Sequence, residues 1–221
     1  MGNSSLSERE PLNAIIDLSH HNQINDFATI KAAGIVAVIH KATQGTDYTD
    51  PMYLQRRNKA LEAGLLWGAY HFADAKDSKA QADYFLSVTD PAPTDLLVLD
   101  IEQNYSRGAP VPSMSLAGAE TFVERIKQQT GRYPGLYSGS YIKEILGDNT
   151  NPMLANCWFW LAQYGSTAVV PVNWPYWTMW QYTDGAKGPE PHSVNGVVSP
   201  CDRDKFNGDL EQLNRLWGVV Q

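Results

Sequence analysis

The sequence predicts an α/β fold in which residues 14–221 form one distorted β/α barrel. Two patterns predict it. Short apolar runs alternate with helix-like segments about eight times within the length of a single domain, as parallel βαβ units require. In the later half the helical patterns weaken and long polar loops replace them, as in GSTAVVPVNWP from Gly165. We therefore expect a single irregular barrel with weak or missing helices in its later half.

The expected strands are the short apolar runs, at 14–19, 35–41, 65–72, 95–102, 134–139, 157–164, 176–183 and 197–204. The expected helices lie at 24–34, 50–64, 78–89, 115–131, 140–147 and 209–218. Pro51 opens one of these helices, and Gly34, Gly64 and Gly131 close three, in keeping with the residues that favour helix starts and stops.

One domain is expected, because the chain shows no linker, internal repeat or low-complexity tract. Residues 1–13 are expected to form a flexible polar arm. Their composition lacks the basic and apolar regions of a secretory signal peptide. No run of 18 or more apolar residues occurs, so no membrane span is expected either.

Composition narrows the function classes. A net charge of −7, a pI near 5.1 and the lack of a Lys/Arg run argue against binding to nucleic-acid phosphates. Seven Trp and eleven Tyr offer flat faces that suit sugar rings, although core packing also uses them. Cys157 and Cys201 allow one disulfide or two free thiols, and we favour free, partly buried thiols.

Two carboxylates end the apolar run LLVLDIE. Side chains alternate across a strand, so Asp100 and Glu102 point to one face, about 7 Å apart along the chain. The carboxyl ends of barrel strands form the active face. A surface pair is the alternative explanation. Asp17 ends the first strand and Asp202 the last, and these strands are neighbours in a closed barrel, so four acids are expected around one pocket.

Crowded, desolvated carboxylates raise one another's pKa, which keeps one acid protonated beside ionised neighbours. Glycoside hydrolysis needs that combination. A site for a hard metal ion is the rival use of four acids, but no metal-binding loop or H-E-x-x-H spacing occurs, and we expect no metal. His71 is expected on the same rim, touching substrate or orienting an acid, with a structural, hydrogen-bonded histidine as the alternative.

The chain resembles glycoside hydrolase family twenty-five, the Chalaropsis-type lysozymes, over about residues 14–217. The segments that carry the resemblance are IIDLSHHNQIND, VAVIHKATQGTDYTDP, GLLWGAYHFA, LLVLDIEQN, GRYPGLYSG, FWLAQY, MWQYTDGAKGP and CDRDKFNG, in the family's order. The resemblance implies a flattened, irregular TIM-like barrel. It also implies a muramidase without cofactors that cleaves the β-1,4 bond between N-acetylmuramic acid and N-acetylglucosamine in peptidoglycan.

By the same resemblance, Glu102 is the general acid, and Asp100 assists the substrate's acetamido group or stabilises positive charge. Asp17 and Asp202 match two further family acids. Substrate contacts are expected from Lys41, Tyr70, Tyr137, Trp180, Gln181 and Tyr182. For Lys41 the alternative is an ion pair without a catalytic role, and for the other residues it is packing. The chain departs from the family pattern at His40, Arg203 and Asp204, so either Asp202 or Asp204 faces the pocket.

Two other functions remain open: a catalytically silent glycan-binding protein on the same barrel, and a hydrolase of chitin-like polymers. The expected partner is the peptidoglycan glycan strand, not nucleic acid, and the expected state is a monomer. A delivery machine or an immunity protein is a further conceivable partner. Because no signal peptide is visible, we expect release by a holin, delivery by a secretion system, or trimming of a secreted form, with action at the bacterial cell wall outside the cytoplasm or in the periplasm.

Overall fold

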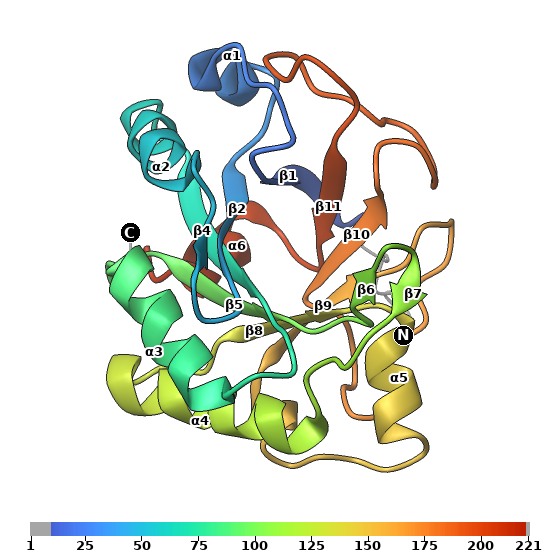
Figure 1. Ribbon diagram of the computed structural model, residues 1–221. Coiled ribbons are helices and arrows are strands. Elements are labelled where there is room, and N and C mark those ends of the chain that lie inside the picture. Colours follow the sequence, from blue (N-terminus) through green and yellow to red (C-terminus); the bar gives the residue numbers. More distant parts are fainter. Residues whose placement is uncertain (1–9, 220–221) are drawn as a thin grey trace, which may run out of the picture.

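The barrel is closed by eight strands around a common axis (Figure 1). The computed structural model describes residues 10–219. In barrel order the strands are β1 (Leu12–Leu18), β11 (Asp202–Phe206), β10 (Met179–Thr183), β9 (Trp158–Ala162), β8 (Gly135–Ser138), β5 (Leu96–Asp100), β4 (Leu66–Phe72) and β2 (Ala37–Gln44). Pairing of β2 with β1 closes the ring, and the short β3 (Tyr48–Thr49) extends β2.

β11 differs from the other barrel strands because it runs antiparallel to both of its neighbours. All the other barrel pairings are parallel. The segment 184–201 leaves β10 and enters β11 at the same end of the barrel, so no crossover helix is needed and the direction reverses. Our prediction of a parallel last strand at 197–204 is therefore wrong in both direction and bounds.

Helices cover only part of the barrel (Figure 1). They are α1 (Phe27–Ala32), α2 (Tyr53–Glu62), α3 (Ser78–Thr89), α4 (Leu116–Thr130), α5 (Ser140–Leu146) and α6 (Leu210–Leu216), with a 3₁₀ turn at Leu154–Asn156. Residues 163–178 and 184–201, both fully described, connect β9 to β10 and β10 to β11 as loops. The prediction of an α/β barrel with missing helices in the later half is confirmed.

Within residues 10–219, four of the six α-helices begin at a residue whose side chain satisfies a terminal backbone group. Asp26, Asp77, Ser115 and Asp209 each cap a helix by accepting a hydrogen bond from a first-turn N–H. Gly131 ends α4 with a φ of 74°, in the left-handed region that favours glycine. These caps explain why the predicted helices at 78–89 and 115–131 match the observed bounds so closely.

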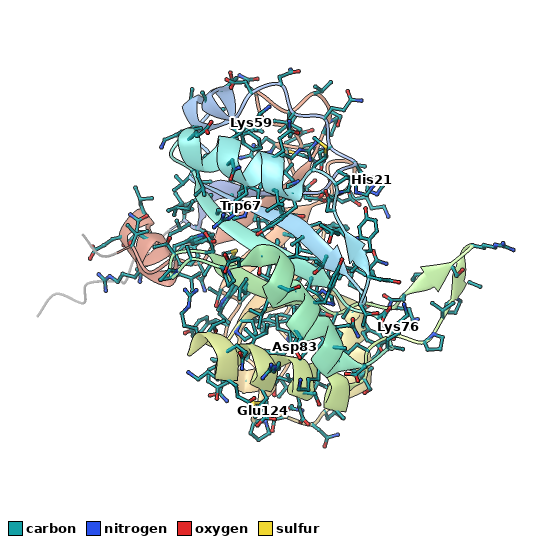
Figure 2. The ribbon with its side chains drawn as sticks, turned by 60° about the vertical axis from the view of Figure 1, so that its left-hand side comes forward. His21, Lys59, Trp67, Lys76, Asp83 and Glu124 are labelled. Carbon is teal, nitrogen blue, oxygen red and sulfur yellow. The ribbon has the colours of Figure 1, made fainter. Side chains whose placement is uncertain are left out.

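The two ends of the barrel differ. At the end where β1 begins, α6 closes the interior: Leu213 and Trp217 pack with inward-facing strand residues such as Ile15, and Trp217 Nε1 donates to the Trp67 carbonyl at 2.8 Å. At the opposite end a hairpin of β6 (Tyr105–Ser106) and β7 (Ala109–Pro110) projects from the rim. Figure 2 shows α6 and this hairpin at opposite ends of the molecule. We call the hairpin end the mouth.

Residues 1–9 of the predicted N-terminal arm lie outside the described residues, but Leu12 and Asn13 do not belong to an arm. They form the start of β1, where the Asn13 amide bonds Tyr182 and Arg203. Cys157 and Cys201 are free and buried, as we favoured. Among the described residues, no helix has the length and apolar character needed to cross a bilayer.

Candidate active site

A cavity of about 260 Å³ opens at the mouth of the barrel. Its lining draws on nearly every strand: Asp17, Ser19, His21, Lys41, Tyr70, Phe72, Asp100, Glu102, Tyr137, Trp160, Tyr164, Gln181 and Asp202. The four acids predicted to share one pocket therefore do share it. Asp100 and Glu102 form one side, which we call the β5 wall. Asp17 and Asp202, with Asp204 beneath them, form the β11 wall.

The β5 wall is held by hydrogen bonds that continue past the end of β5. The Ile101 N–H donates to the Tyr137 carbonyl at 3.0 Å, and Ser138 Oγ donates to the Ile101 carbonyl at 2.6 Å. Ile101 is buried in the layer between strands and helices, so Asp100 and Glu102 face the cavity from either side of it, as strand alternation predicts.

Burial is the main reason why the two carboxyls of this wall have raised pKa values. It raises the pKa of Asp100 well above its usual range, and the neighbouring Glu102 raises it further. Burial also raises the pKa of Glu102. Asp100 is 5% exposed, and its Oδ1 has no hydrogen-bond partner, whereas Glu102 is half-buried and nearer to solvent. The two carboxyls thus hold a proton well above the pH at which an exposed acid would lose it.

Lys41 is the cation of the β5 wall. Its Nζ donates to Gln44 Oε1 at 2.7 Å and lies 4.8 Å from the centre of the Phe72 ring. Burial lowers the Lys41 pKa, while Asp100 raises it, and the lysine in turn lowers the pKa of both acids. Because Lys41 bonds an amide rather than a carboxylate, neither acid is locked into an ion pair.

The β11 wall is built from a chain of hydrogen bonds. Gln181 Nε2 donates to Asp17 Oδ2 at 2.7 Å, and Gln181 Oε1 accepts from the hydroxyls of Tyr137 at 2.8 Å and Tyr164 at 3.0 Å. Burial raises the Asp17 pKa well above its usual range, and the charges of Asp202 and Asp204 raise it further. Asp17 is therefore held in place by a neutral amide and surrounded by acids.

The structure settles which acid of CDRD faces the pocket. β11 alternates, so Asp202 and Asp204 both point inward: Asp202 lines the cavity, whereas Asp204 is fully buried beneath it. Asp204 Oδ1 accepts from Trp160 Nε1 at 2.8 Å, and its carboxyl bonds that of Asp17. Burial, aided by Asp184 and Glu102, raises the pKa of Asp202 to about 6.

His71 lies outside the pocket, so the prediction that it sits on the rim is wrong. Its neighbour Tyr70 points into the barrel, and His71 points to the helices, where its ring is fully buried beside Phe122. Its Nδ1 bonds Thr43 Oγ1 at 2.7 Å and its Nε2 bonds Gln81 Oε1 at 3.0 Å. His71 is the structural, hydrogen-bonded histidine of the alternative interpretation.

The prediction that Trp180 and Tyr182 contact substrate beside Gln181 is also wrong. Alternation along β10 turns both outward. Trp180 Nε1 donates to the Gln163 carbonyl at 2.7 Å, and the Tyr182 hydroxyl donates to the Pro191 carbonyl at 3.0 Å. Where a helix is missing, these rings cover the outer face of the barrel. Of the three residues, only Gln181 reaches the cavity.

Five lining residues were not predicted: Ser19, His21, Phe72, Trp160 and Tyr164. Two of them carried a usable signal. Phe72 lies two residues beyond Tyr70 on the same face of β4, and Trp160 is an inward residue of β9, whose bounds were predicted nearly correctly. Ser19, His21 and Tyr164 lie in loops beyond strand ends, where alternation no longer applies.

The arrangement suits acid catalysis on a polar substrate. Acids occupy facing walls, a desolvated carboxyl pair keeps a proton available, and Tyr70, Tyr137 and Trp160 add aromatic surface to the cavity. Within residues 10–219, no cluster of three or more His, Cys, Asp or Glu side chains has the arrangement to hold a metal ion.

Comparisons with known proteins agree with this chemistry. The family model "Glycosyl hydrolases family 25" matches residues 16–190. Lysozyme M1 of Streptomyces globisporus is 35% identical over 91% of this chain and 70% of its own length, and the N,O-diacetylmuramidase of a Chalaropsis species is 34% identical over 82% and 93%. The crystal structure of a bacterial lysozyme from Streptomyces coelicolor superposes with a TM-score of 0.83 at 33% identity, covering 96% of this chain and 99% of that one. A family 25 lysozyme from Aspergillus fumigatus superposes at 0.78, with 29% identity and coverage of 94% and 99%. The chain therefore belongs to glycosyl hydrolase family 25 and is a glycoside hydrolase.

Proposed function

We propose that the protein is a muramidase that hydrolyses the β-1,4 bond between N-acetylmuramic acid and N-acetylglucosamine in bacterial peptidoglycan. The carrying observation is the β5 wall, a desolvated carboxyl pair at the mouth of a glycoside hydrolase barrel. The lysozyme and muramidase names of the relatives support the choice of substrate.

Glu102 is the proposed general acid. Burial raises its pKa, and once the acetamido group holds Asp100 ionised, the proton of the carboxyl pair lies on Glu102, from which it can pass to the leaving glycosidic oxygen. Its greater exposure than Asp100 supports this assignment, because the proton donor has to reach the scissile bond. After bond cleavage the same carboxylate is placed to accept a proton from the attacking water.

Asp100 is proposed to act on the substrate's acetamido group. Its buried Oδ1 lacks a partner and would accept a hydrogen bond from the acetamido N–H. Such a bond orients the acetamido oxygen toward the anomeric carbon and offsets the positive charge that develops there. This is a substrate-assisted route, one of the exceptions to the scheme with a carboxylate nucleophile.

The remaining predicted residues of the cavity have proposed binding roles. Asp17 and Asp202 face the β5 wall across the space where an oxocarbenium-like sugar would lie, and either carboxyl would stabilise its positive charge once ionised. Tyr70, Tyr137 and Gln181 are proposed to contact the sugar. Lys41 is proposed to limit the rise in the pKa values of Asp100 and Glu102 through its positive charge. The site of action is the cell wall, and we propose that the protein works there as a monomer.

The test is the product formed by purified protein and by a Glu102→Gln variant on peptidoglycan. The wild type should release fragments with N-acetylmuramic acid at the reducing end, identified by mass spectrometry. The variant keeps the shape of the side chain but has no proton to donate, so kcat/KM should fall about 1,000-fold or more.

Two results would contradict the proposal. Binding of the wall by both proteins with release of fragments by neither would favour a silent binding protein. Cleavage of chitin oligosaccharides but not of peptidoglycan would favour the chitin-directed alternative.

A further inference from the structure

A second hollow lies beside the active cavity. It has a volume of about 430 Å³, and Lys41 and Phe72 line both spaces, so the two adjoin. One side comes from the segment after β4, with Asp74 and Lys76, and the other from the base of the projecting hairpin, with Tyr105 and Val111. We call this hollow the side groove. Figure 2 shows Lys76 and the hairpin at the same end of the molecule.

The hairpin wall of the side groove is rigid and tied to the catalytic strand end. Gln103, the residue after Glu102, donates from Nε2 to the carbonyls of Asn104 and Val111 and to Ser113 Oγ, at 2.9–3.1 Å. The hairpin turns through Arg107 and Gly108, both at positive φ, as a tight two-residue connection does. Its position relative to Glu102 is therefore fixed rather than adaptable.

The groove surface has the mixed character of a peptide site. Tyr105 is 65% exposed although it is a large aromatic, and Val111 and Pro112 add apolar surface beside it. Asn104, 7% exposed, donates to the Ala73 carbonyl, but its Oδ1 has no partner. A carbonyl oxygen without a donor in the lining suits a ligand that brings N–H groups.

Charge separates the side groove from the cavity. The cavity is lined by four acids and one lysine, whereas the groove is lined by two lysines and one acid. Lys76 Nζ lies 3.6 Å from Asp74 and 3.9 Å from Asp47, beyond hydrogen-bonding distance, and its side chain is 59% exposed. Lys76 can therefore approach a further anion. The side groove therefore carries less negative charge than the cavity and has an exposed lysine in its lining.

We propose that the side groove binds the peptide branch of the substrate, with Lys76 facing a peptide carboxylate and Tyr105 packing on the peptide. This rests on the proposed muramidase function. In peptidoglycan the sugars carry no net charge once the lactyl group is joined to the peptide, so the free carboxylates lie on the peptide. A partly apolar groove beside the cavity, with an exposed lysine in its lining, matches that branch better than it matches a further neutral sugar.

The test compares two substrates made from one wall preparation: stem-bearing peptidoglycan, and the same glycan strands stripped of peptides by an amidase, with the freed lactyl carboxylates then converted to methylamides so that the stripped strands carry no charge. Lys76→Ala and Tyr105→Ala should each lower kcat/KM on the stem-bearing substrate about threefold and leave the stripped substrate unchanged. Added salt should shrink the Lys76 effect, because the contact is exposed. Lys79→Ala on α3, equally 59% exposed, and Tyr176→Ala, 60% exposed, are matched controls outside the groove.

Each outcome decides the proposal. A loss confined to the stem-bearing substrate supports it. Equal losses on both substrates would assign the groove to a sugar and overturn it, as would no loss on either. If the wild type cleaves neither substrate, the muramidase function itself fails, and this result is distinct from an active enzyme that does not discriminate between the two substrates.

Discussion

The two walls of the pocket hold their acids in different ways. On the β11 wall, Asp17 accepts from Gln181 and Asp204 Oδ1 accepts from Trp160, whereas the buried Asp204 Oδ2 has no donor among the described residues apart from a proton shared with Asp17. On the β5 wall, Asp100 Oδ1 accepts nothing, and Lys41 bonds an amide rather than either acid. Each buried carboxyl of the β11 wall therefore has at least one protein donor, whereas Asp100 Oδ1 on the β5 wall would gain its donor from a substrate.

From this contrast we expect the β5 wall to take part in the reaction and the β11 wall to hold its side chains in position. A buried carboxyl without donors is costly in the free protein and gains most when a ligand supplies the missing partner. A carboxyl already bonded to an amide or an indole gains little. Substitutions on the β5 wall should therefore affect turnover more than substitutions on the β11 wall.

After Glu102→Gln, the largest effect is expected from Asp100→Asn. The amide cannot supply the negative charge, so kcat/KM should fall about 100-fold. Stability should rise instead, because the substitution removes a desolvated carboxyl and its repulsion with Glu102. Kinetics on peptidoglycan and thermal unfolding of the same samples check both signs. A variant that is both active and less stable would contradict the assignment.

Asp202→Asn should change the pH dependence of stability. Because the Asp202 pKa is raised to about 6 in the folded protein, the folded state holds the proton more tightly than the unfolded chain. The wild type therefore loses stability as the pH rises from about 4 through about 6, by on the order of 2 kcal/mol. Urea denaturation at several pH values should show the variant losing less over this window. Parallel curves for the two proteins would refute the shift.

A smaller change is expected from Asp204→Asn. Its new amide can still accept from Trp160 and can donate to Asp17, so the shape of the β11 wall is kept. In the wild type, Asp204 raises the Asp17 pKa both by its charge and by accepting its proton, so the variant should lower that pKa. Carbon-13 NMR titration of the aspartate carboxyls measures it, with Asp17→Asn to assign the signal. We expect kcat/KM to change less than about tenfold, and an unaltered Asp17 titration would exclude the shared proton.

The smallest effects are expected on stability, from removing either tyrosine hydroxyl that donates to Gln181. Tyr137→Phe removes a donor that is 9% exposed and should cost about 1 kcal/mol of stability. Tyr164→Phe removes a donor on a ring that is 40% exposed, and water can replace part of that bond. Chemical denaturation should rank Tyr137→Phe as the more destabilising. The reverse order would mean that Gln181 is held mainly from the loop.

The sequence was most informative where a strand end could be located. Alternation along 95–102 placed Asp100 and Glu102 on one face, and closure of the barrel placed Asp17 beside Asp202, which pair directly across β1 and β11. The same alternation along WQY (180–182) and YH (70–71) turns Trp180, Tyr182 and His71 away from the pocket. The resemblance assigned consecutive residues of a family motif to the pocket, whereas a strand presents only every second residue to one side.

Other features could not be obtained from local patterns. The direction of β11 depends on the path of residues 184–201, which carry no helical periodicity and so give no sign of where they cross the barrel. Asp204 was recognised as an acid near the pocket, but its depth depends on Trp160, 44 residues earlier in the chain. Loop residues such as His21 reach the cavity through tertiary packing alone.

The reversal at β11 has a practical consequence for handling the protein. Because the last strand runs away from the mouth, α6 and the last described residues lie at the opposite end of the barrel from the projecting hairpin (Figure 2). A surface or carrier attached at this end of the chain would therefore lie at the end of the barrel opposite the mouth. Immobilised in that orientation, the enzyme would present its open face to an insoluble polymer too large to diffuse to it.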